Sequence, residues 1–162
     1  MLKSNSHGNS MEFNSWRYDA FTKKEKTQYA LAFEKASVIF NLAATCTAIA
    51  ASQNRLEAEG LKIAFNYFQT ASGLFLYISD NFLHAASVDM SRDCIKTLVE
   101  LSLAQAQECF IEKLVLCEHK KGALISKLCA QLSFMYSNVS DGFSLESLKG
   151  QFEKAWVEMV KV

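Results

Sequence analysis

Proline is absent from this chain of 162 residues, and glycine occurs only six times. Proline interrupts helices and glycine weakens them, so a chain almost free of both can form long helices but offers few tight turns. Half of the residues are hydrophobic, which is enough for a sizeable core and too many for an intrinsically disordered chain. The sequence therefore predicts one all-α domain.

Apolar residues recur at helical spacing in five stretches. The predicted helices span residues 29–54, 58–81, 91–117, 123–138 and 144–161. Asp89 or Ser91 can cap the third of these helices, and Ser144 the fifth. Short connections between long helices predict antiparallel helical hairpins, in a stack like that of tetratricopeptide repeats.

The N-terminal residues follow other patterns. Residues 1–10 are polar, and we expect a disordered leader there, with the helical domain spanning residues 11–162. Residues 11–21 alternate aromatic and polar groups, which favours an extended segment or a short strand. Residues 22–28 read TKKEKTQ and predict a charged connector exposed to solvent.

Periodicity also predicts which side chains are buried. In the first helix we expect Phe33, Leu42 and Ile49 to face the core, and in the second we expect close packing at Gly73. A turn is expected at residues 141–142, after a fourth helix whose core stripe is Ile125, Leu128, Cys129 and Leu132.

The polar N-terminus shows no secretory signal, so we expect buried free thiols in a reducing cytosol at Cys46, Cys94, Cys109, Cys117 and Cys129.

Composition argues against several functions. The 17 basic side chains balance 17 acidic ones, whereas nucleic-acid binding and attraction to an anionic membrane need surplus positive charge. Residues 36–54 and 63–79 carry no charge, but they contain too many polar side chains for a membrane span. We therefore expect neither nucleic acid nor a bilayer as a direct partner.

The sequence offers little catalytic chemistry. Cys109, Cys117 and His119 have a spacing that fits no common zinc pattern, and no phosphate-binding loop or nucleophile elbow is present. Nothing places His84 or His119 beside a thiol. We therefore expect no metal, cofactor or small-molecule substrate and disfavour an enzyme. An enzyme that uses a thiol is the weakest of three functional hypotheses.

Six segments in series resemble the Bro domain family of ALIX, the His-domain tyrosine phosphatase and the fungal protein PalA. The segments are W-R-Y-D-A-F (16–21), F-E-K-A-S-V-I-F-N-L-A-A (33–44), E-G-L-K-I-A…F-Q-T-A-S-G-L-F (59–75), S-V-D-M-S (87–91), L-A-Q-A-Q-E-C-F-I-E-K (103–113) and L-I-S-K-L (124–128). The resemblance covers the middle of the family's domain. It implies a curved helical body around a tetratricopeptide-like core.

The resemblance also implies a non-catalytic adaptor. The family's domain binds the C-terminal amphipathic helix of an ESCRT-III subunit, by insertion of apolar anchors into a groove with charges at its rim. A cytoplasmic protein recruited to endosomes only through such partners is expected. The alternative hypothesis is a helical scaffold that has lost this partner and dimerises through exposed helix faces.

Four residues match contact positions of the family. Phe110 corresponds to an apolar anchor, Leu124 and Leu128 to two aliphatic contacts one helix later, and Lys62 to a rim lysine. An acidic rim residue of some members is replaced here by Ala58. Judged from the residues alone, Phe110 and Leu128 also fit a core and Lys62 a solvated surface, whereas Leu124 lies beside its helix's core stripe.

Overall fold

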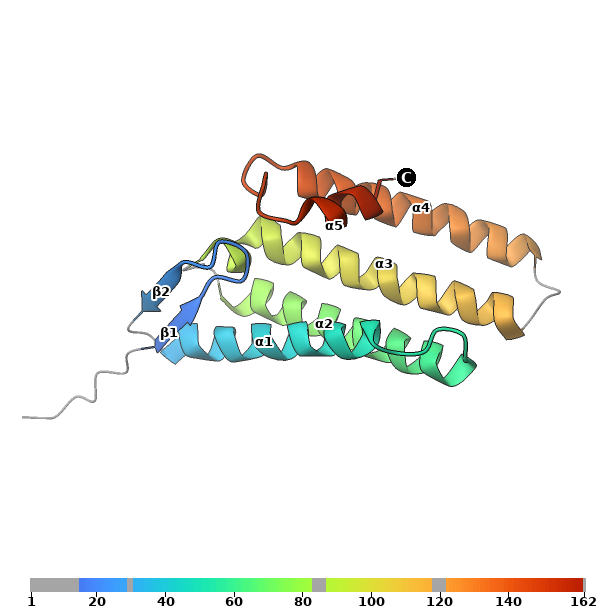
Figure 1. Cartoon of the computed structure of the whole chain (residues 1–162), viewed down its shortest axis with the longest axis horizontal. Coiled ribbons are helices and arrows are strands. Elements are labelled where there is room, and N and C mark those ends of the chain that lie inside the picture. Colours follow the sequence, from blue (N-terminus) through green and yellow to red (C-terminus); the bar gives the residue numbers. More distant parts are fainter. Residues whose placement is uncertain (1–14, 29–30, 83–86, 118–121, 162) are drawn as a thin grey trace, which may run out of the picture.

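The computed structural model describes residues 15–28, 31–82, 87–117 and 122–161. Four long helices run along the length of this part of the chain, with α3 between α2 and α4 (Figure 1). Each packs against the next, so the predicted all-α fold of antiparallel hairpins is confirmed. The expected leader, residues 1–10, lies outside the described residues. The four helices are α1 (Leu31–Ala51), α2 (Ala58–Asn81), α3 (Arg92–Cys117) and α4 (Gly122–Ser144).

A two-stranded sheet precedes the helices. Strand β1 (Ser15–Tyr18) pairs antiparallel with β2 (Glu25–Gln28), and Trp16 lies opposite Thr27. The strand expected within residues 11–21 is present. The prediction that residues 22–28 form a connector is wrong for its second half, because residues 25–28 form strand β2. The segment EKTQ has no alternating apolar residues, so only its pairing with β1 makes it a strand.

The α1 helix buries two phenylalanines and several small residues. Its buried positions include Phe33, Phe40 and Ala43, whereas Leu42 is 51% exposed and Ile49 only half-buried. The predicted core position of Leu42 is therefore wrong. Alanine and cysteine side chains on the inner face let α2 approach closely, and this tertiary contact fixes the rotation of α1 about its axis.

Two clusters of buried side chains form the core. The larger one joins α1, α2, α3 and the end of α4, around Phe40, Phe75, Ile95 and Phe143. The smaller one lies where α1 ends and α2 begins, and it consists of Ala50, Leu61, Ala64, Phe68, Ala106 and Cys109. The core is therefore thinner toward the C-terminal end of α3.

The C-terminal region differs most from expectation. Helix α4 continues through residues 141–142, where a turn was predicted, and the expected helix over 144–161 is reduced to α5 (Lys154–Met159). At Gly142 a Cβ atom would lie 2.6 Å from Oγ1 of Thr97, so this glycine lets α4 pass close to α3. Gly73 is exposed, and a Cβ atom at this position would have no neighbour within 4 Å, so the close packing predicted there is wrong.

Two of the five cysteines are not buried. Cys117, the last residue of α3, is exposed. Cys129 is exposed because α4 buries only Val139 and Phe143 and leaves most of its predicted core stripe half-covered. The expected core position of Cys129 is wrong. Cys46, Cys94 and Cys109 are buried free thiols, as predicted.

Two of the segments that carry the family resemblance meet in a buried polar cluster. Arg17 of W-R-Y-D-A-F donates to Asp89 of S-V-D-M-S at 2.6 Å, and the Ala20 N–H donates to the same carboxylate at 2.7 Å. The Asp89 N–H in turn donates to Asp19 at 3.2 Å. The cluster fastens the sheet to the 3-10 helix η1 (Val88–Met90), and α3 is capped by Ser91 rather than Asp89.

The Asp19 carboxylate is held in its charged form. Burial alone would raise its pKa, but hydrogen bonds from the backbone N–H groups of Thr22, Asp89 and Phe21 outweigh burial and lower the pKa below its ordinary value. The sheet is therefore anchored by an ionised side chain, and this anchor weakens when acid protonates it.

Candidate partner-binding site

A tight turn between α1 and α2 positions the first side chain of the site. At Gly60 a Cβ atom would lie only 2.0 Å from the carbonyl oxygen of Asn54, so only glycine permits this approach. Asn54 also accepts from the Leu56 N–H at 3.1 Å and donates to Glu57 at 2.8 Å. Lys62 follows in the first turn of α2, exposed and 3.4 Å from the Glu59 carboxylate.

Phe110 on α3 packs beside an aromatic ring of α2, the helix that carries Lys62. The Phe110 ring lies 6.1 Å from that of Phe65, centroid to centroid, and Phe65 is one turn after Lys62 on α2. Phe110 is 38% exposed, although its neighbour Cys109 belongs to the smaller core cluster. An aromatic side chain thus stands partly in solvent above a thin core, with a lysine on the adjacent helix.

Leu124 and Leu128 lie one turn apart on α4, so they share one face of that helix. Leu124 is 43% exposed and Leu128 is half-buried. Contacts of Tyr136 with Glu108 and of Gly142 with Thr97 fix the antiparallel register of α3 and α4. Because the two helices run antiparallel, Leu128 and then Leu124 lie beyond Phe110 along the hairpin.

The structure leaves all four predicted site residues at least partly exposed, on three consecutive helices. Burial of all three apolar side chains, which would exclude a binding role, is not found. Phe110 packs beside Phe65 of α2, the helix that also carries Lys62, whereas Leu124 and Leu128 lie on α4, which packs against α3.

A polar network behind Phe110 was missed by sequence reasoning. Arg55 donates two hydrogen bonds to Glu112, at 2.8 and 2.5 Å, and lies 3.1 Å from Glu108. The Tyr136 hydroxyl donates to the other Glu108 oxygen at 2.6 Å. The network joins the α1–α2 turn, α3 and α4, and it fixes the backbone from which Phe110 projects. In the sequence, this network is indicated by Glu108 and Glu112, two glutamates one turn apart on a mostly apolar helix.

The charges of this network are stabilised by one another. Burial disfavours the Arg55 cation, but its hydrogen bond to Glu112 and the nearby charge of Glu108 raise its pKa above the ordinary value. Burial and the hydrogen bond to Glu108 raise the pKa of Tyr136, so its hydroxyl stays protonated and remains a donor. Arg55 and Tyr136 therefore both stay protonated near neutral pH and act as hydrogen-bond donors to the glutamates.

The buried thiols are poorly suited to nucleophilic chemistry. Burial raises the pKa of both Cys94 and Cys109, which disfavours the thiolate that would react.

His84 and His119 lie outside the described residues. Within the part of the chain that the structure describes, no three His, Cys, Asp or Glu side chains are grouped so as to hold a metal ion. Among the described helices, none is both long and apolar enough to cross a bilayer.

Comparison with known proteins agrees with this architecture. The family model of the BRO1-like domain matches residues 2–162, nearly the whole chain. The chain belongs to the BRO1-like domain family. The resemblance inferred from the six sequence segments is thus confirmed.

Two relatives show how far the similarity extends in the sequence. The chain is 48% identical to the vacuolar protein-sorting protein bro1 of Emericella nidulans over 145 residues, which are 90% of this chain but 14% of that protein. It is 33% identical to the tyrosine-protein phosphatase non-receptor type 23 of Homo sapiens over 147 residues, 89% of this chain and 9% of that protein.

The fold is shared with a complex of the ALIX BRO1 domain and CHMP4C. The TM-score is 0.80 at 32% identity, covering 88% of this chain and 41% of that one. The chain therefore spans less than half of the ALIX BRO1 chain and a small part of each full-length relative.

Proposed function

We propose that this chain is a non-catalytic adaptor module that binds the C-terminal amphipathic helix of an ESCRT-III subunit. Phe110, Leu124 and Leu128 would provide the apolar contacts, and Lys62 a charged contact at the rim. The observation that carries the proposal is the partial exposure of these apolar side chains on the packed pair α3 and α4. Exposed apolar side chains on a rigid helical pair are the usual receptor for an amphipathic helix.

The dimensions support this partner. Leu124 and Leu128 are separated by about 6 Å along α4, which is about one turn of a bound helix. A ligand helix that places apolar residues three, four and seven positions apart can contact all of them from one face. Lys62, beside Phe65 on α2, can then meet an acidic residue of that helix.

The relatives support the cellular setting. One is named for vacuolar protein sorting, and the ALIX BRO1 structure contains CHMP4C, an ESCRT-III subunit. We infer a cytoplasmic protein that reaches endosomes through its protein partner. The matched region is only 9% of the phosphatase relative, so that relative's name does not alter the proposal.

One matched pair of variants tests the binding surface. Leu124→Asp puts a charge into the apolar contact and should weaken binding of a CHMP4C C-terminal helix peptide at least about thirtyfold. Leu145→Asp is the control, because Leu145 is also 43% exposed but lies after the far end of α4. Calorimetric titration of the peptide would refute the role of Leu124 if both variants bind like the wild type.

A scaffold that self-associates is the second candidate, and one surface favours it. Leu31, Val38 and Leu42 are all more than half exposed and form a stripe along the outer face of α1. Sedimentation equilibrium separates the candidates: a stable dimer that ignores the CHMP4C peptide supports the scaffold, whereas a monomer that binds it supports the adaptor.

A further inference from the structure

The exposed apolar stripe on α3 continues past the candidate site. Leu103 lies seven residues before Phe110, or two turns of the helix, so both side chains project from the same face. Leu103 is 40% exposed and Phe110 is 38% exposed. The site residues predicted on α3 end at Phe110, whereas the stripe extends about 10 Å further toward the start of the helix.

The side chains of α2 at the level of Leu103 are polar. Ser72 of α2 donates to the carbonyl oxygen of Val99 at 3.4 Å, one turn before Leu103 on α3. Gln69, one turn before Ser72 on α2, is exposed. Phe110, by contrast, has an aromatic neighbour on α2. Leu103 therefore keeps an apolar surface that a partner can cover.

Helix α4 extends the same surface through Met135. Met135 follows Leu124 by eleven residues and Leu128 by seven, so the three side chains share one face over about 16 Å of the helix. Met135 is half-buried, and its unbranched side chain can adapt to different neighbours. The apolar stripe of α4 is therefore about three turns long.

One hydrogen bond sets Met135 level with the middle of α3. Tyr136, the next residue of α4, donates to Glu108 at 2.6 Å. Because the helices are antiparallel, the part of α4 after Tyr136 runs beside the first half of α3, where Leu103 lies about 8 Å before Glu108. Leu103 and Met135 therefore lie toward one end of the surface, and Leu124 lies at the other end.

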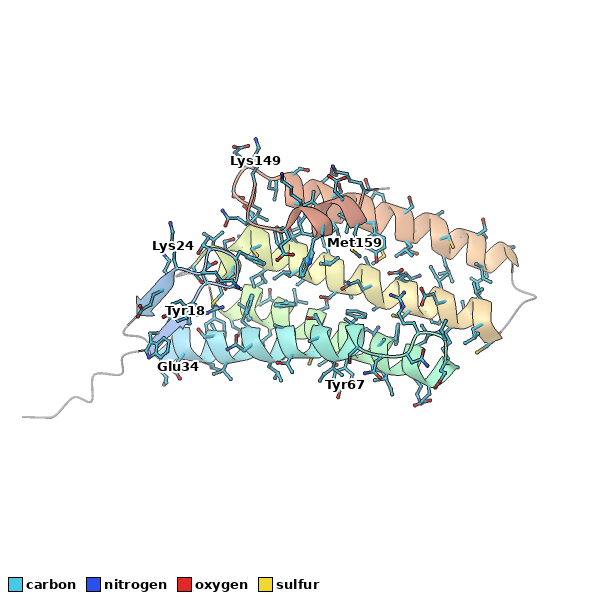
Figure 2. The ribbon with its side chains drawn as sticks, in the orientation of Figure 1. Tyr18, Lys24, Glu34, Tyr67, Lys149 and Met159 are labelled. Atoms are coloured by element: carbon cyan, nitrogen blue, oxygen red, sulfur yellow. The ribbon has the colours of Figure 1, made fainter. Side chains whose placement is uncertain are left out.

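This surface lies on the side of the α3–α4 hairpin away from α5. Leu101 is about 200° around α3 from Leu103, and it lines a cavity that α1 and α5 also line. Figure 2 shows Met159 of α5 beside α3 on that side. Tyr136 of α4 lines the same cavity, whereas Met135 is about 100° around α4 from Tyr136. Leu103 and Met135 therefore turn away from the face that α5 occupies.

We propose that the ESCRT-III helix lies along the whole surface from Leu124 to Leu103, with one terminal turn packed between Leu103 and Met135. This inference rests on the proposed function and adds to it the length and the pattern of the partner helix. A helix that covers about 16 Å needs at least three turns, or roughly 12 residues, with apolar residues at helical spacing throughout. Continuity with the surface at Phe110 and Leu128 argues for this occupant, because a single helix reaches both ends.

Two substitutions at Leu103 and one control test the extension. Leu103→Asp puts a charge into the terminal contact and should weaken binding of a CHMP4C C-terminal helix peptide at least about tenfold. Leu103→Met keeps an apolar side chain and should bind within about twofold of the wild type. Leu42→Asp changes a leucine that is 51% exposed on α1, and it should leave binding unchanged. Calorimetric titration measures these affinities.

Shortened peptides locate the terminal contact. Two peptides each lack about four residues, one at each end of the CHMP4C helix. The peptide that lacks the turn beside Leu103 should bind Leu103→Asp as tightly as it binds the wild type, because the altered contact is already missing. The other peptide should keep the difference of about tenfold. Equal affinity in the first case also shows that the Leu103→Asp variant is folded.

Methionine methyl signals provide a direct readout. The Met135 methyl group should shift when the full-length peptide is added, whereas the methyl group of Met159, which is 82% exposed on α5, should stay unchanged. The peptide that lacks the turn beside Leu103 should give a smaller shift at Met135.

Three results would overturn the inference. Wild-type affinity of Leu103→Asp, combined with weak binding of Leu124→Asp, would end the surface at Phe110 while the proposed function stands. An equal loss by Leu103→Asp for the full-length and both shortened peptides would assign its effect to the fold rather than to a contact. No binding of the full-length peptide to the wild type would refute the proposed function and the inference together.

Discussion

Helices α2 and α4 have almost the same length but very different environments. Eight of the 24 residues of α2 are buried, against two of the 23 residues of α4. Helix α2 lies between α1 and α3, whereas α4 packs on α3 alone among the long helices. The comparison shows that α1, α2 and α3 form most of the stable body, whereas α4 adds only Val139 and Phe143 to the main core and leaves its other apolar side chains exposed or half-buried.

The largest expected effect separates two leucines on these helices. Leu61→Ala in α2 should lower the free energy of unfolding by about 3 kcal/mol, because it leaves a cavity at a side chain that is 1% exposed. Leu124→Ala in α4 should cost less than about 1 kcal/mol. Urea unfolding of both variants measures the difference. Equal losses would show that α4 is as much a part of the body as α2.

Two glycines sharpen the same comparison with effects of opposite sign. Gly142→Ala should destabilise the protein by about 1–2 kcal/mol, because its new methyl group meets Thr97 where α4 crosses α3. Gly73→Ala should stabilise it by about 0.5–1 kcal/mol, since this exposed site inside α2 has room and alanine favours the helix. Thermal unfolding of both variants checks the signs, and a stabilised Gly142→Ala variant would contradict the close approach.

Acid should weaken the polar cluster that fastens the sheet to this body. The pKa of Asp19 is lowered in the fold, so its contribution to stability is complete above its ordinary value of 3.8 and is lost as the pH falls through the lower, folded value. Asp19→Asn should cost about 1–1.5 kcal/mol at neutral pH and make unfolding less dependent on pH in this acidic range. A variant with the wild-type pH profile would show that another group is responsible.

The smallest effect concerns the link between α3 and α4. Tyr136→Phe removes the hydroxyl that donates to Glu108, and it should cost about 1 kcal/mol or less because water can reach the carboxylate. Amide hydrogen exchange should become faster in α4 and stay unchanged in α2. Faster exchange in both helices would mean that the two unfold as one unit.

Sequence patterns predicted where the helices begin and end better than which side of each helix is buried. The bounds of α2 and α3 follow directly from periodic apolar residues with few helix breakers, and the predicted 58–81 coincides with α2. The buried face of α1 was predicted correctly at Phe33 and wrongly at Leu42, because close packing on α2 uses Phe40 and small residues such as Ala43 instead. The end of α4 was missed because Asp141-Gly142 has the composition of a turn but is used for helix contact.

The candidate site was predictable only in part. Phe110, Leu124, Leu128 and Lys62 came from the family resemblance, and their exposure depends on which helix packs where. The network of Arg55, Glu108, Glu112 and Tyr136 joins residues far apart in the sequence, so no local pattern contains it. A cavity is lined by Ala48 of α1, Leu101 of α3 and Trp156 of α5, and it likewise exists only after these helices are placed around one another.

The most direct measurement is methyl NMR of the chain during titration with the CHMP4C C-terminal helix. The account predicts that the largest shifts occur at the methyl groups of Leu124 and Leu128, with Ala48 and Leu101 in the cavity nearly unchanged. Shifts concentrated at Ala48 and Leu101, or no shifts at saturating peptide, would contradict the assignment of the ESCRT-III helix to the α3–α4 surface.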